Sequence, residues 1–336
     1  MPQANRSLTP NEIDAFGHEG YLAVEGFLAD DDLQPVIDEL RREVTARARK
    51  LVEEGALKRT YEDLGFTRQL VSINRDDDTL LPSVSSSALS GPAIFHLITN
   101  HRLLDIAESL CGPEVIASSV YRVRPKLPDD PRGEVPWHQD SGYIDPYCDD
   151  ALIVTMWIPL LDATEENGCL FVIPRAHHGA VLTHEANDTG NYLRIPDRAL
   201  PKQLEPVAVP IRKGGVLLLT NRTPHASFEN RSDDVRWSLD IRYQSTDLPT
   251  NAPITRTPLE QEALTRAEVP PACYPPSRDF LVRSRRRPDE VVTDPDVFHR
   301  VRSEHRARFD AGLRAAKAGS RRQVAVNPFS RQRWES

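Results

Sequence analysis

The residues Trp137-His138-Gln139-Asp140 place an imidazole and a carboxylate two positions apart. Residues i and i+2 of a β-strand face the same side of the sheet. We therefore expect His138 and Asp140 to converge on one metal ion if this segment is a strand. A single His-x-Asp pair arises easily by chance in a chain with 10 histidines and 28 aspartates, so the pair needs a third ligand before it indicates a metal site.

A second histidine supplies that ligand. His225 lies just after the apolar run Gly215 to Thr220, where a predicted strand ends and opens into a loop. Two histidines and one carboxylate form the facial triad of non-haem iron(II) sites, which leaves coordination positions open for other groups.

Arg236 follows His225 by eleven residues, inside the predicted strand VRWSLDIRY. A buried guanidinium group could hold a carboxylate with two hydrogen bonds, and the hydroxyl of Ser238 would lie beside it on the same strand face. The alternative is a structural ion pair between Arg236 and one of three nearby acids, Asp233, Asp234 or Asp240.

The N-terminal third, which must support these residues, is predicted to be mainly helical. Thr9-Pro10-Asn11-Glu12 has the composition of a helix start, and Gly20 is expected to end that helix. We predict a strand at 21–27, a long helix from residue 30, a loop at 75–92 and a helix at 93–110.

The pattern then changes to short apolar or β-branched runs separated by turns. These predicted strands are residues 115–123, 151–161, 168–173, 206–211, 215–220 and 235–243. No strand–helix alternation and no Gly-x-Gly-x-x-Gly motif is present, so a β-sandwich or jelly roll is favoured over a dinucleotide-binding fold. We predict a single domain over residues 1–336, with helical support at 8–114, a jelly-roll core at 115–245 and a basic extension at 246–336.

Composition excludes several classes of protein. The chain has 336 residues, 39% hydrophobic and 27% charged, with a net charge of -8. Four cysteines in unrelated spacings exclude a disulfide scaffold, and residues 151–161 are too short an apolar run to span a membrane. The first residues have no apolar signal segment, so we expect a cytoplasmic protein with no membrane partner.

The charge is unevenly distributed. Residues 256–336 carry 17 basic and 11 acidic residues, whereas residues 1–255 carry 25 basic and 39 acidic residues. Because the arginines of the basic extension mingle with acids and lack interleaved aromatic residues, we expect them to pack against the acidic body and not to bind nucleic acid.

Four segments give the chain a recognisable likeness. They are LTPNEIDAFGHEGYLAVEGFL, PWHQD, IVTMWIPLLDATEENGCLFVIPRAHH and PHASFENRSDDVRWSLDIRY, in this order. Together they resemble the phytanoyl-CoA dioxygenase family of iron(II)- and 2-oxoglutarate-dependent oxygenases. The resemblance implies a mainly β fold with flanking helices around a double-stranded β-helix, that is, a cupin-like jelly roll.

The resemblance also implies roles for particular residues. His138, Asp140 and His225 would be the iron ligands, and Arg236 would bind the distal carboxylate of 2-oxoglutarate. Trp157 and Gln139 stand where relatives have residues at the cosubstrate site. Thr155 and Ser238, which share strand faces with Trp157 and Arg236, are further candidates. The cofactors implied are Fe(II), 2-oxoglutarate and O₂.

The reaction that the resemblance implies is hydroxylation of a C–H bond in a small molecule, with release of succinate and CO₂. The alternatives are desaturation, cyclisation or epimerisation with the same cofactors, or a jelly-roll protein that binds a metal or ligand without turnover. Asp140 argues against halogenation, because iron-dependent halogenases lack this carboxylate. The acids Asp145 and Asp149 after the motif favour a polar or cationic substrate; the substrate's identity and the oligomeric state stay open.

Overall fold

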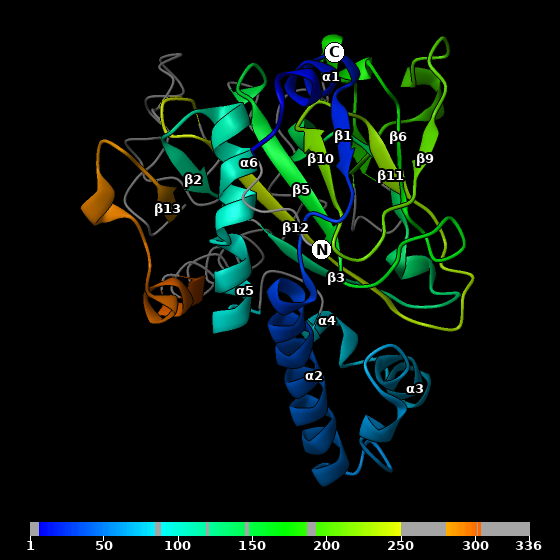
Figure 1. Ribbon diagram of the computed structural model, residues 1–336. Helices are drawn as coiled ribbons and strands as arrows, with labels where there is room; N and C mark the ends of the chain where they lie inside the picture. The colour runs from blue at the N-terminus through cyan, green and yellow to red at the C-terminus, as the bar shows by residue number, and fades with distance from the viewer. Residues whose placement is uncertain are drawn as a thin grey trace, which may run out of the picture.

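The chain is described by a computed structural model that covers residues 7–84, 89–118, 121–144, 148–186, 193–249, 280–300 and 302–303. Two sheets form its centre, and helices from the N-terminal third lie against the larger sheet (Figure 1). The helices are α1 (Pro10–Glu19), α2 (Asp30–Glu53), α3 (Gln69–Asp76), α4 (Leu81–Val84), α5 (Pro92–Ile98) and α6 (His101–Cys111).

The predicted start of the first helix is confirmed. Thr9 and Glu12 form a capping box, in which the Thr9 hydroxyl accepts from the Glu12 amide and the Glu12 carboxylate accepts from the Thr9 amide at 2.9 Å. Gly20 ends the helix in the left-handed region at φ 82°, and a Cβ at this position would lie only 2.3 Å from Nδ1 of His177. Helix α1 therefore stops where the strand that follows must join the sheet.

Two of the helical predictions are wrong in detail. The expected single helix at 93–110 is two helices, because Asn100 leaves the helical conformation and its side chain caps α6 by accepting from the amide of Arg102 at 3.0 Å. The expected loop at 75–92 contains the end of α3 and the short helix α4.

The larger sheet has seven strands in the order β1-β10-β5-β12-β2-β13, and β3 also pairs with β12. The smaller sheet has four strands in the order β4-β11-β6-β9. The strands of the larger sheet are β1 (Tyr21–Val24), β2 (Val115–Ala117), β3 (Arg122–Lys126), β5 (Ile153–Pro159), β10 (Val216–Thr220), β12 (Arg236–Ser245) and β13 (Phe280–Arg283). Those of the smaller sheet are β4 (Val135–His138), β6 (Leu170–Val172), β9 (Val207–Val209) and β11 (His225–Ser227), and β7 (Glu185–Ala186) pairs with β8 (Leu193–Arg194).

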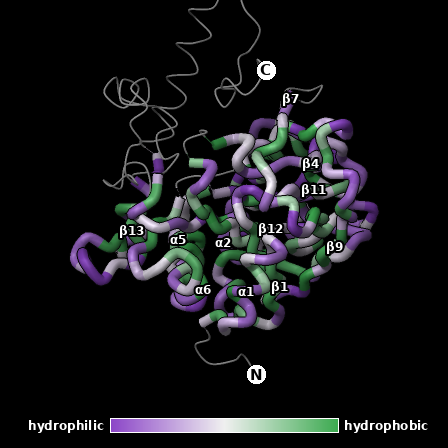
Figure 2. The backbone as a smooth tube through the Cα atoms, turned by 90° about the horizontal axis from the view of Figure 1, so that it is seen from above, coloured by the Kyte–Doolittle hydropathy of each residue, from purple (hydrophilic) through white to green (hydrophobic). Residues whose placement is uncertain are grey.

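These two facing, mostly antiparallel sheets form the predicted double-stranded β-helix, with the helices packed outside it. Seen from above, β4, β9 and β11 lie at one end of the molecule, and α5, α6 and β13 lie at the other (Figure 2). The predicted strand at 115–123 is in fact two strands, β2 and β3.

The central strands of the larger sheet divide their residues between two environments. Val154, Met156 and Ile158 of β5 face the helices and join the larger apolar core, whereas Trp157 joins the smaller core between the sheets. On β12, Trp237 and Leu239 also face the helices. Complete burial of an aliphatic side chain stabilises the folded state by about 1.5–3 kcal/mol. Packing on the helix-facing side of the sheet therefore holds the strands in place, and the other side carries the residues of the candidate site.

The C-terminal segment packs against the body by charge and by aromatic contact. Arg283 binds Asp105 at 2.8 Å and Glu108 at 2.9 Å. The fully buried ring of Phe298, in the helical residues 295–300, lies 4.9 Å from that of Phe280. The expected packing of the basic extension is thus confirmed for its described part; the rest of the helix predicted at 296–317 lies outside the described residues. Among the residues that the structure describes, no helix is both long and apolar enough to cross a membrane.

Candidate metal centre and cosubstrate site

His138 and His225 lie directly opposite each other in the smaller sheet. His138 ends β4 and His225 begins β11, and these residues are register partners in an antiparallel pair. Their ring centroids are 4.2 Å apart. The expectation that His225 lies in a loop is therefore wrong: it is the first residue of a short strand, and pairing with β4 brings the two imidazoles together.

The same local contact orients both imidazoles. Nδ1 of His138 lies 2.9 Å from the carbonyl oxygen of Pro136, and Nδ1 of His225 lies 3.0 Å from that of Thr223. Because a carbonyl oxygen can only accept, each Nδ1 carries the proton and each Nε2 keeps a lone pair. Burial, together with the neighbouring His225, lowers the pKa of His138 well below its ordinary value, which favours the neutral ring that binds metals.

Asp140 reaches the same place by a turn. Strand β4 ends at His138, and Asp140 is the first residue of a 3-10 helix at Asp140–Tyr143, so the strand alternation assumed from the sequence does not apply. Its buried carboxylate accepts from the Thr155 hydroxyl at 2.6 Å and from Nε and Nη2 of Arg242 at 3.0 and 2.9 Å. Burial alone would raise the pKa of Asp140, but the Arg242 guanidinium holds this pKa well below its usual range.

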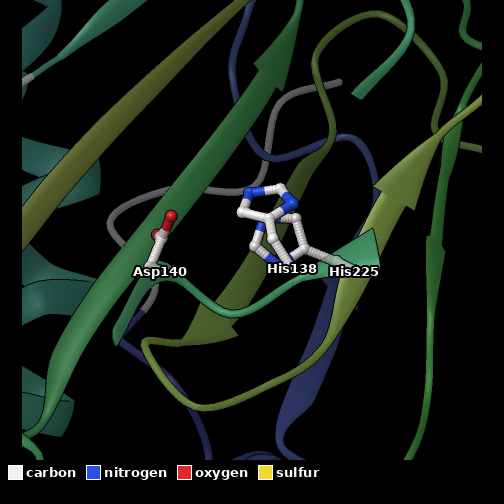
Figure 3. Close-up of side chains that lie close together, drawn as sticks. All are labelled: His138, Asp140 and His225. Atoms are coloured by element: carbon white, nitrogen blue, oxygen red, sulfur yellow. The ribbon is translucent and has the colours of Figure 1, made fainter. Parts of the chain in front are cut away.

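The three side chains could hold one metal ion. One nitrogen or oxygen atom from each of His138, Asp140 and His225 lies within 4.8 Å of the others (Figure 3). Two neutral imidazoles and one carboxylate are the donor set of non-haem iron(II) sites, so the residues fit this ion. No other group of three such side chains meets this criterion within the described part of the chain.

Arg236 lies deep between the two sheets and is 2% exposed. Its Nη1 donates to Ser238 Oγ at 2.6 Å, and its Nη2 donates to the carbonyl of Gly168 at 3.1 Å and to Ser227 Oγ at 3.2 Å. Burial lowers the pKa of Arg236 to about 10, so it is still a cation at neutral pH.

The structural ion pair considered for Arg236 is not formed among the described residues. Asp234 binds Arg68 at 3.0 Å and Asp240 binds Arg124 at 2.5 Å, whereas Arg236 has only the neutral partners given above. Its positive charge is therefore buried without an acid of its own, which is the arrangement that an anionic ligand would complete.

Trp157 contributes a second donor beside this arginine. The guanidinium carbon of Arg236 lies 5.2 Å from the centre of the Trp157 ring. Nε of Arg236 and Nε1 of Trp157 are both buried, and neither has a hydrogen-bond partner in the described structure. Because an unpaired buried donor costs about 1–3 kcal/mol, the two N–H groups point to an acceptor such as a carboxylate.

The side chain of Gln139 forms its hydrogen bonds with backbone groups. Its Oε1 accepts from the amide of Leu182 at 2.7 Å and its Nε2 donates to the carbonyl of Arg222 at 2.6 Å. Its own amide donates to Nε2 of His184 at 3.0 Å. These contacts favour a role in positioning the metal-ligand segment; contact with the cosubstrate stays a prediction for Gln139 as for Thr155 and Ser238.

Two histidines and two cysteines of the described chain lie outside the metal-ligand group. Nε2 of His177 lies 3.0 Å from the carbonyl oxygen of Gly17, and Nε2 of His178 lies 2.9 Å from that of His18. These contacts connect the end of α1 to the segment that follows β6 of the smaller sheet. Burial raises the pKa of Cys111 to about 12 and that of Cys169 to about 11, as expected for inert thiols. Asp145 and Tyr147, predicted at the mouth, lie outside the described residues.

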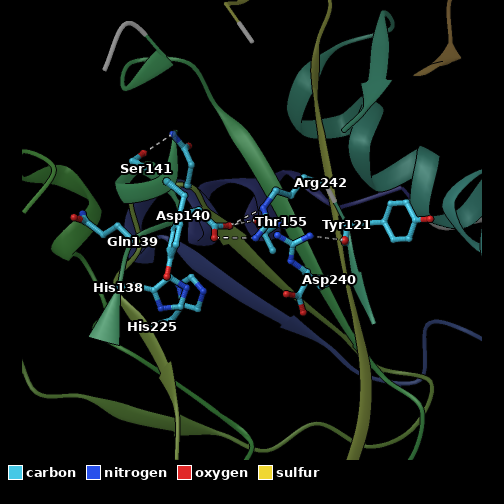
Figure 4. A network of polar contacts seen from close by, with 12 residues as sticks. Tyr121, His138, Gln139, Asp140, Ser141, Thr155, His225, Asp240 and Arg242 are labelled. Atoms are coloured by element: carbon cyan, nitrogen blue, oxygen red, sulfur yellow. Dashed lines mark hydrogen bonds and ion pairs between the residues drawn. The ribbon is translucent and has the colours of Figure 1, made fainter. Parts of the chain in front are cut away.

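Sequence reasoning missed Arg242. The signal was present in strand β12, whose alternate residues Arg236, Ser238, Asp240 and Arg242 are polar in an otherwise apolar run. With a period of two, these four side chains share one face of the strand. The contact of Arg242 with Asp140, seen in Figure 4, shows that this face is turned toward the metal ligands.

A His–carboxylate–His group and a buried arginine inside a double-stranded β-helix define the class of non-haem iron oxygenases. A sequence model of the phytanoyl-CoA dioxygenase family matches residues 16–238. The chain belongs to this family and is a 2-oxoglutarate-dependent non-haem iron oxygenase.

Relatives of the chain match it over most of their length. It is 26% identical to a phytanoyl-CoA dioxygenase of Arabidopsis thaliana over 262 residues, which cover 72% of this chain and 90% of that protein. It is 28% identical over 267 residues to phytanoyl-CoA dioxygenase domain-containing protein 1 of Bos taurus, covering 68% and 87% of the two chains. The crystal structure of EctD from S. alaskensis is similar in fold, with a TM-score of 0.50 and 19% identity over 75% of this chain and 82% of that one.

Proposed function

We propose that the chain hydroxylates a C–H bond of a small molecule with iron(II), 2-oxoglutarate and O₂. The observation that carries this proposal is the position of His138, Asp140 and His225 around one point, inside the same barrel as the unpaired donors of Arg236 and Trp157. A protein that only stores a metal has no need of a buried guanidinium group beside the metal site.

The three side chains would hold the iron at a fixed position, because each of them is itself held in place. Both imidazoles are held by their Nδ1–H groups, so their Nε2 atoms need no reorientation before the metal binds. Thr155 and Arg242 hold the Asp140 carboxylate from neighbouring strands. When bound, iron(II) and 2-oxoglutarate supply the activation of O₂, coupled to the conversion of 2-oxoglutarate to succinate and CO₂.

Arg236 would orient the cosubstrate through its distal carboxylate. Its Nη atoms are held by Ser238, Ser227 and Gly168, which fixes the plane of the guanidinium group. This arrangement leaves Nε of Arg236, with Nε1 of Trp157 nearby, to donate to the carboxylate. The apolar surroundings of Trp157, Leu217 and Leu219 exclude water and strengthen these charge-assisted hydrogen bonds.

Hydroxylation is favoured over halogenation because Asp140 supplies a carboxylate as the third ligand. Desaturation, cyclisation and epimerisation would begin with the same hydrogen abstraction, and the position of the substrate would decide among them.

The test is an anaerobic titration of the protein with iron(II) and 2-oxoglutarate, followed by the weak visible band of a bidentate 2-oxo acid complex. We expect the band in the wild type, and we expect Arg236→Gln to raise the Kd of 2-oxoglutarate at least tenfold without changing iron affinity. Arg75→Gln, at an exposed position, is the control. Absence of the band at saturating ligand, or an unchanged Kd in Arg236→Gln, would contradict the proposal. With a substrate in hand, incorporation of one labelled oxygen atom from O₂ into the product distinguishes hydroxylation from the alternatives.

A further inference from the structure

The turn at residues 139–142, which carries the proposed acidic ligand, lies between two segments that are distant from it in sequence. On one side, the amide of Ser141 donates to the carbonyl of Asn221 at 2.8 Å, and Nδ2 of Asn221 donates to Ser141 Oγ at 3.0 Å. The chain continues from Asn221 directly to His225 at the start of β11. On the other side lie residues 182–184, which come just before β7. The turn is thus held between a segment that leads to one proposed iron ligand and a segment that carries none.

His184 is a buried histidine, 4% exposed, that contacts this turn. Its Nδ1 lies 2.8 Å from the carbonyl oxygen of Leu182, so Nδ1 carries the proton and Nε2 keeps a lone pair. Nε2 accepts a hydrogen bond from the backbone amide of Gln139 at 3.0 Å. A carbonyl two residues earlier fixes the proton position, as it does in His138 and His225. In His184, however, the lone pair receives a backbone N–H group.

This hydrogen bond acts on the residue that joins two of the proposed iron ligands. Gln139 lies between His138 and Asp140 and is fully buried, so its amide requires an acceptor inside the protein. The side chain of Gln139 returns to the same segment, because its Oε1 accepts from the amide of Leu182 at 2.7 Å. Any rotation at Gln139 would move His138 and Asp140 relative to each other. The two hydrogen bonds to residues 182–184 therefore hold these ligands in one relative position.

Gly142 brings the turn into direct contact with the imidazole ring of His184. A Cβ atom at this position would lie 2.5 Å from both Cδ2 and Nε2 of His184 and 2.8 Å from its Cε1. Gly142 is not one of the glycines with a positive φ, so the absence of a side chain here serves the close approach of the ring. The ring therefore supports the turn at Gly142 while its Nε2 holds the amide of Gln139.

We propose that His184 is a positioning residue for the iron site. Its contacts with Gln139 and Gly142 hold the turn so that the three side chains of Figure 3 meet in the geometry that binds iron(II). This inference rests on the proposed function, because it takes those three side chains as the iron ligands. Replacement of a residue that orients metal ligands without touching the metal typically weakens metal binding by about ten- to a hundredfold.

The experiment compares iron affinity with stability in variants of His184. His184→Phe keeps an aromatic ring but has no acceptor for the Gln139 amide, whereas His184→Gln offers Oε1 as an acceptor in place of Nε2. Anaerobic calorimetry gives the Kd of iron(II), and chemical denaturation gives the stability of the metal-free protein. We expect His184→Phe to raise this Kd about tenfold or more and His184→Gln to restore it to within about threefold of the wild-type value. At saturating iron(II) and 2-oxoglutarate, the visible band should shift in His184→Phe and keep its wild-type position in His184→Gln.

A matched control separates positioning from packing. Tyr243→Phe also removes a buried hydrogen bond to a backbone carbonyl, but Tyr243 belongs to the helix-facing core. It should lower stability and leave the Kd of iron(II) and the visible band unchanged. If His184→Phe fails to fold, Gly142→Ala tests the same contact, because the added Cβ pushes the ring away from Gln139, and it should raise the Kd of iron(II) by about threefold or more. Gly17→Ala, where a Cβ meets nothing within 4 Å, is the control for that variant.

Two outcomes overturn the inference. One is that the folded variants His184→Phe and Gly142→Ala bind iron(II) as tightly as the wild type, whatever their loss of stability, since His184 would then serve packing alone. The other is that His184→Gln binds iron(II) as weakly as His184→Phe, which would mean that the acceptor for the Gln139 amide does not hold the ligands. Both leave the proposed function standing, because the wild type still binds iron and 2-oxoglutarate. Failure of the wild type to bind them would instead contradict the proposed function.

Discussion

Arg242 and Asp140 form a buried ion pair with two hydrogen bonds, from Nη2 to Oδ1 at 2.9 Å and from Nε to Oδ2 at 3.0 Å. The exposed fractions of the two side chains are 11% and 5%. Arg242 is also the register partner of Thr155, whose hydroxyl binds the same carboxylate. Two neighbouring strands of the larger sheet thus hold the proposed acidic metal ligand, which lies outside both sheets at the start of a 3-10 helix.

The ion pair predicts how stability depends on the metal. Arg242→Gln leaves the buried carboxylate of Asp140 without its counter-charge, and removal of one partner of a buried pair costs about 3–5 kcal/mol. We expect a loss of this size in the metal-free protein and a smaller loss with saturating iron(II), because the metal then neutralises Asp140. Anaerobic chemical denaturation with and without iron measures both values, with Arg41→Gln as control. Equal losses under both conditions would show that Asp140 does not bind the metal.

Trp157 should contribute to cosubstrate affinity through its N–H group. Trp157→Phe keeps an aromatic ring but removes Nε1, so we expect the Kd of 2-oxoglutarate to rise about tenfold, the cost of one hydrogen bond to a charged group. Iron affinity should not change. The control is Trp237→Phe: Trp237 is equally buried, but it lies on the opposite, helix-facing side of the larger sheet and donates to the carbonyl of Phe66. Similar Kd values for both variants would exclude the indole of Trp157 as a cosubstrate donor.

Gln139 should matter more for stability than for the cosubstrate. Gln139→Met has a similar volume but leaves the amide of Leu182 and the carbonyl of Arg222 unpaired, at a cost of about 1–3 kcal/mol for each group. We expect destabilisation with little change in the Kd of 2-oxoglutarate, measured by denaturation and calorimetry. Gln203→Met, at an exposed position, is the control. A large rise in this Kd without a loss of stability would assign Gln139 to the cosubstrate instead.

Glu114 should make the attachment of the C-terminal segment sensitive to acid. Burial would raise the pKa of Glu114, but hydrogen bonds from the Ser284 hydroxyl and from the amides of Arg286 and Arg285 lower it to about 2. A lowered pKa contributes stability that is complete above the ordinary value of 4.5 and is lost as the pH falls toward 2.

The stability difference between the wild type and Glu114→Gln should therefore fall by about half between pH 6 and pH 3. Denaturation midpoints across this range measure the difference, and Glu205→Gln, at an exposed position, is the control. A difference that does not depend on pH would mean that the carboxylate is not ionised through these contacts.

The features that the sequence determines by itself are local. The capping box of Thr9 and Glu12 sets the start of α1, because both partners lie within one helical turn. The alternation of polar and apolar residues in β12 places Arg236 and Ser238 on one strand face, because the side-chain period of a strand is two. The order of short apolar runs likewise indicates a sandwich or jelly roll, and the four segments that contain His138, Asp140, His225 and Arg236 resemble the family.

The remaining features depend on how distant strands align. Pairing of β4 with β11 brings His225 opposite His138, and a turn after β4, not strand geometry, brings Asp140 to them. Arg242 reaches Asp140 across 102 positions of sequence. Such contacts follow from the register of sheets that close on each other, and register is set by packing over the whole core. The alternation in β12 indicates which strand face Arg242 lies on, but it does not indicate which residue Arg242 contacts.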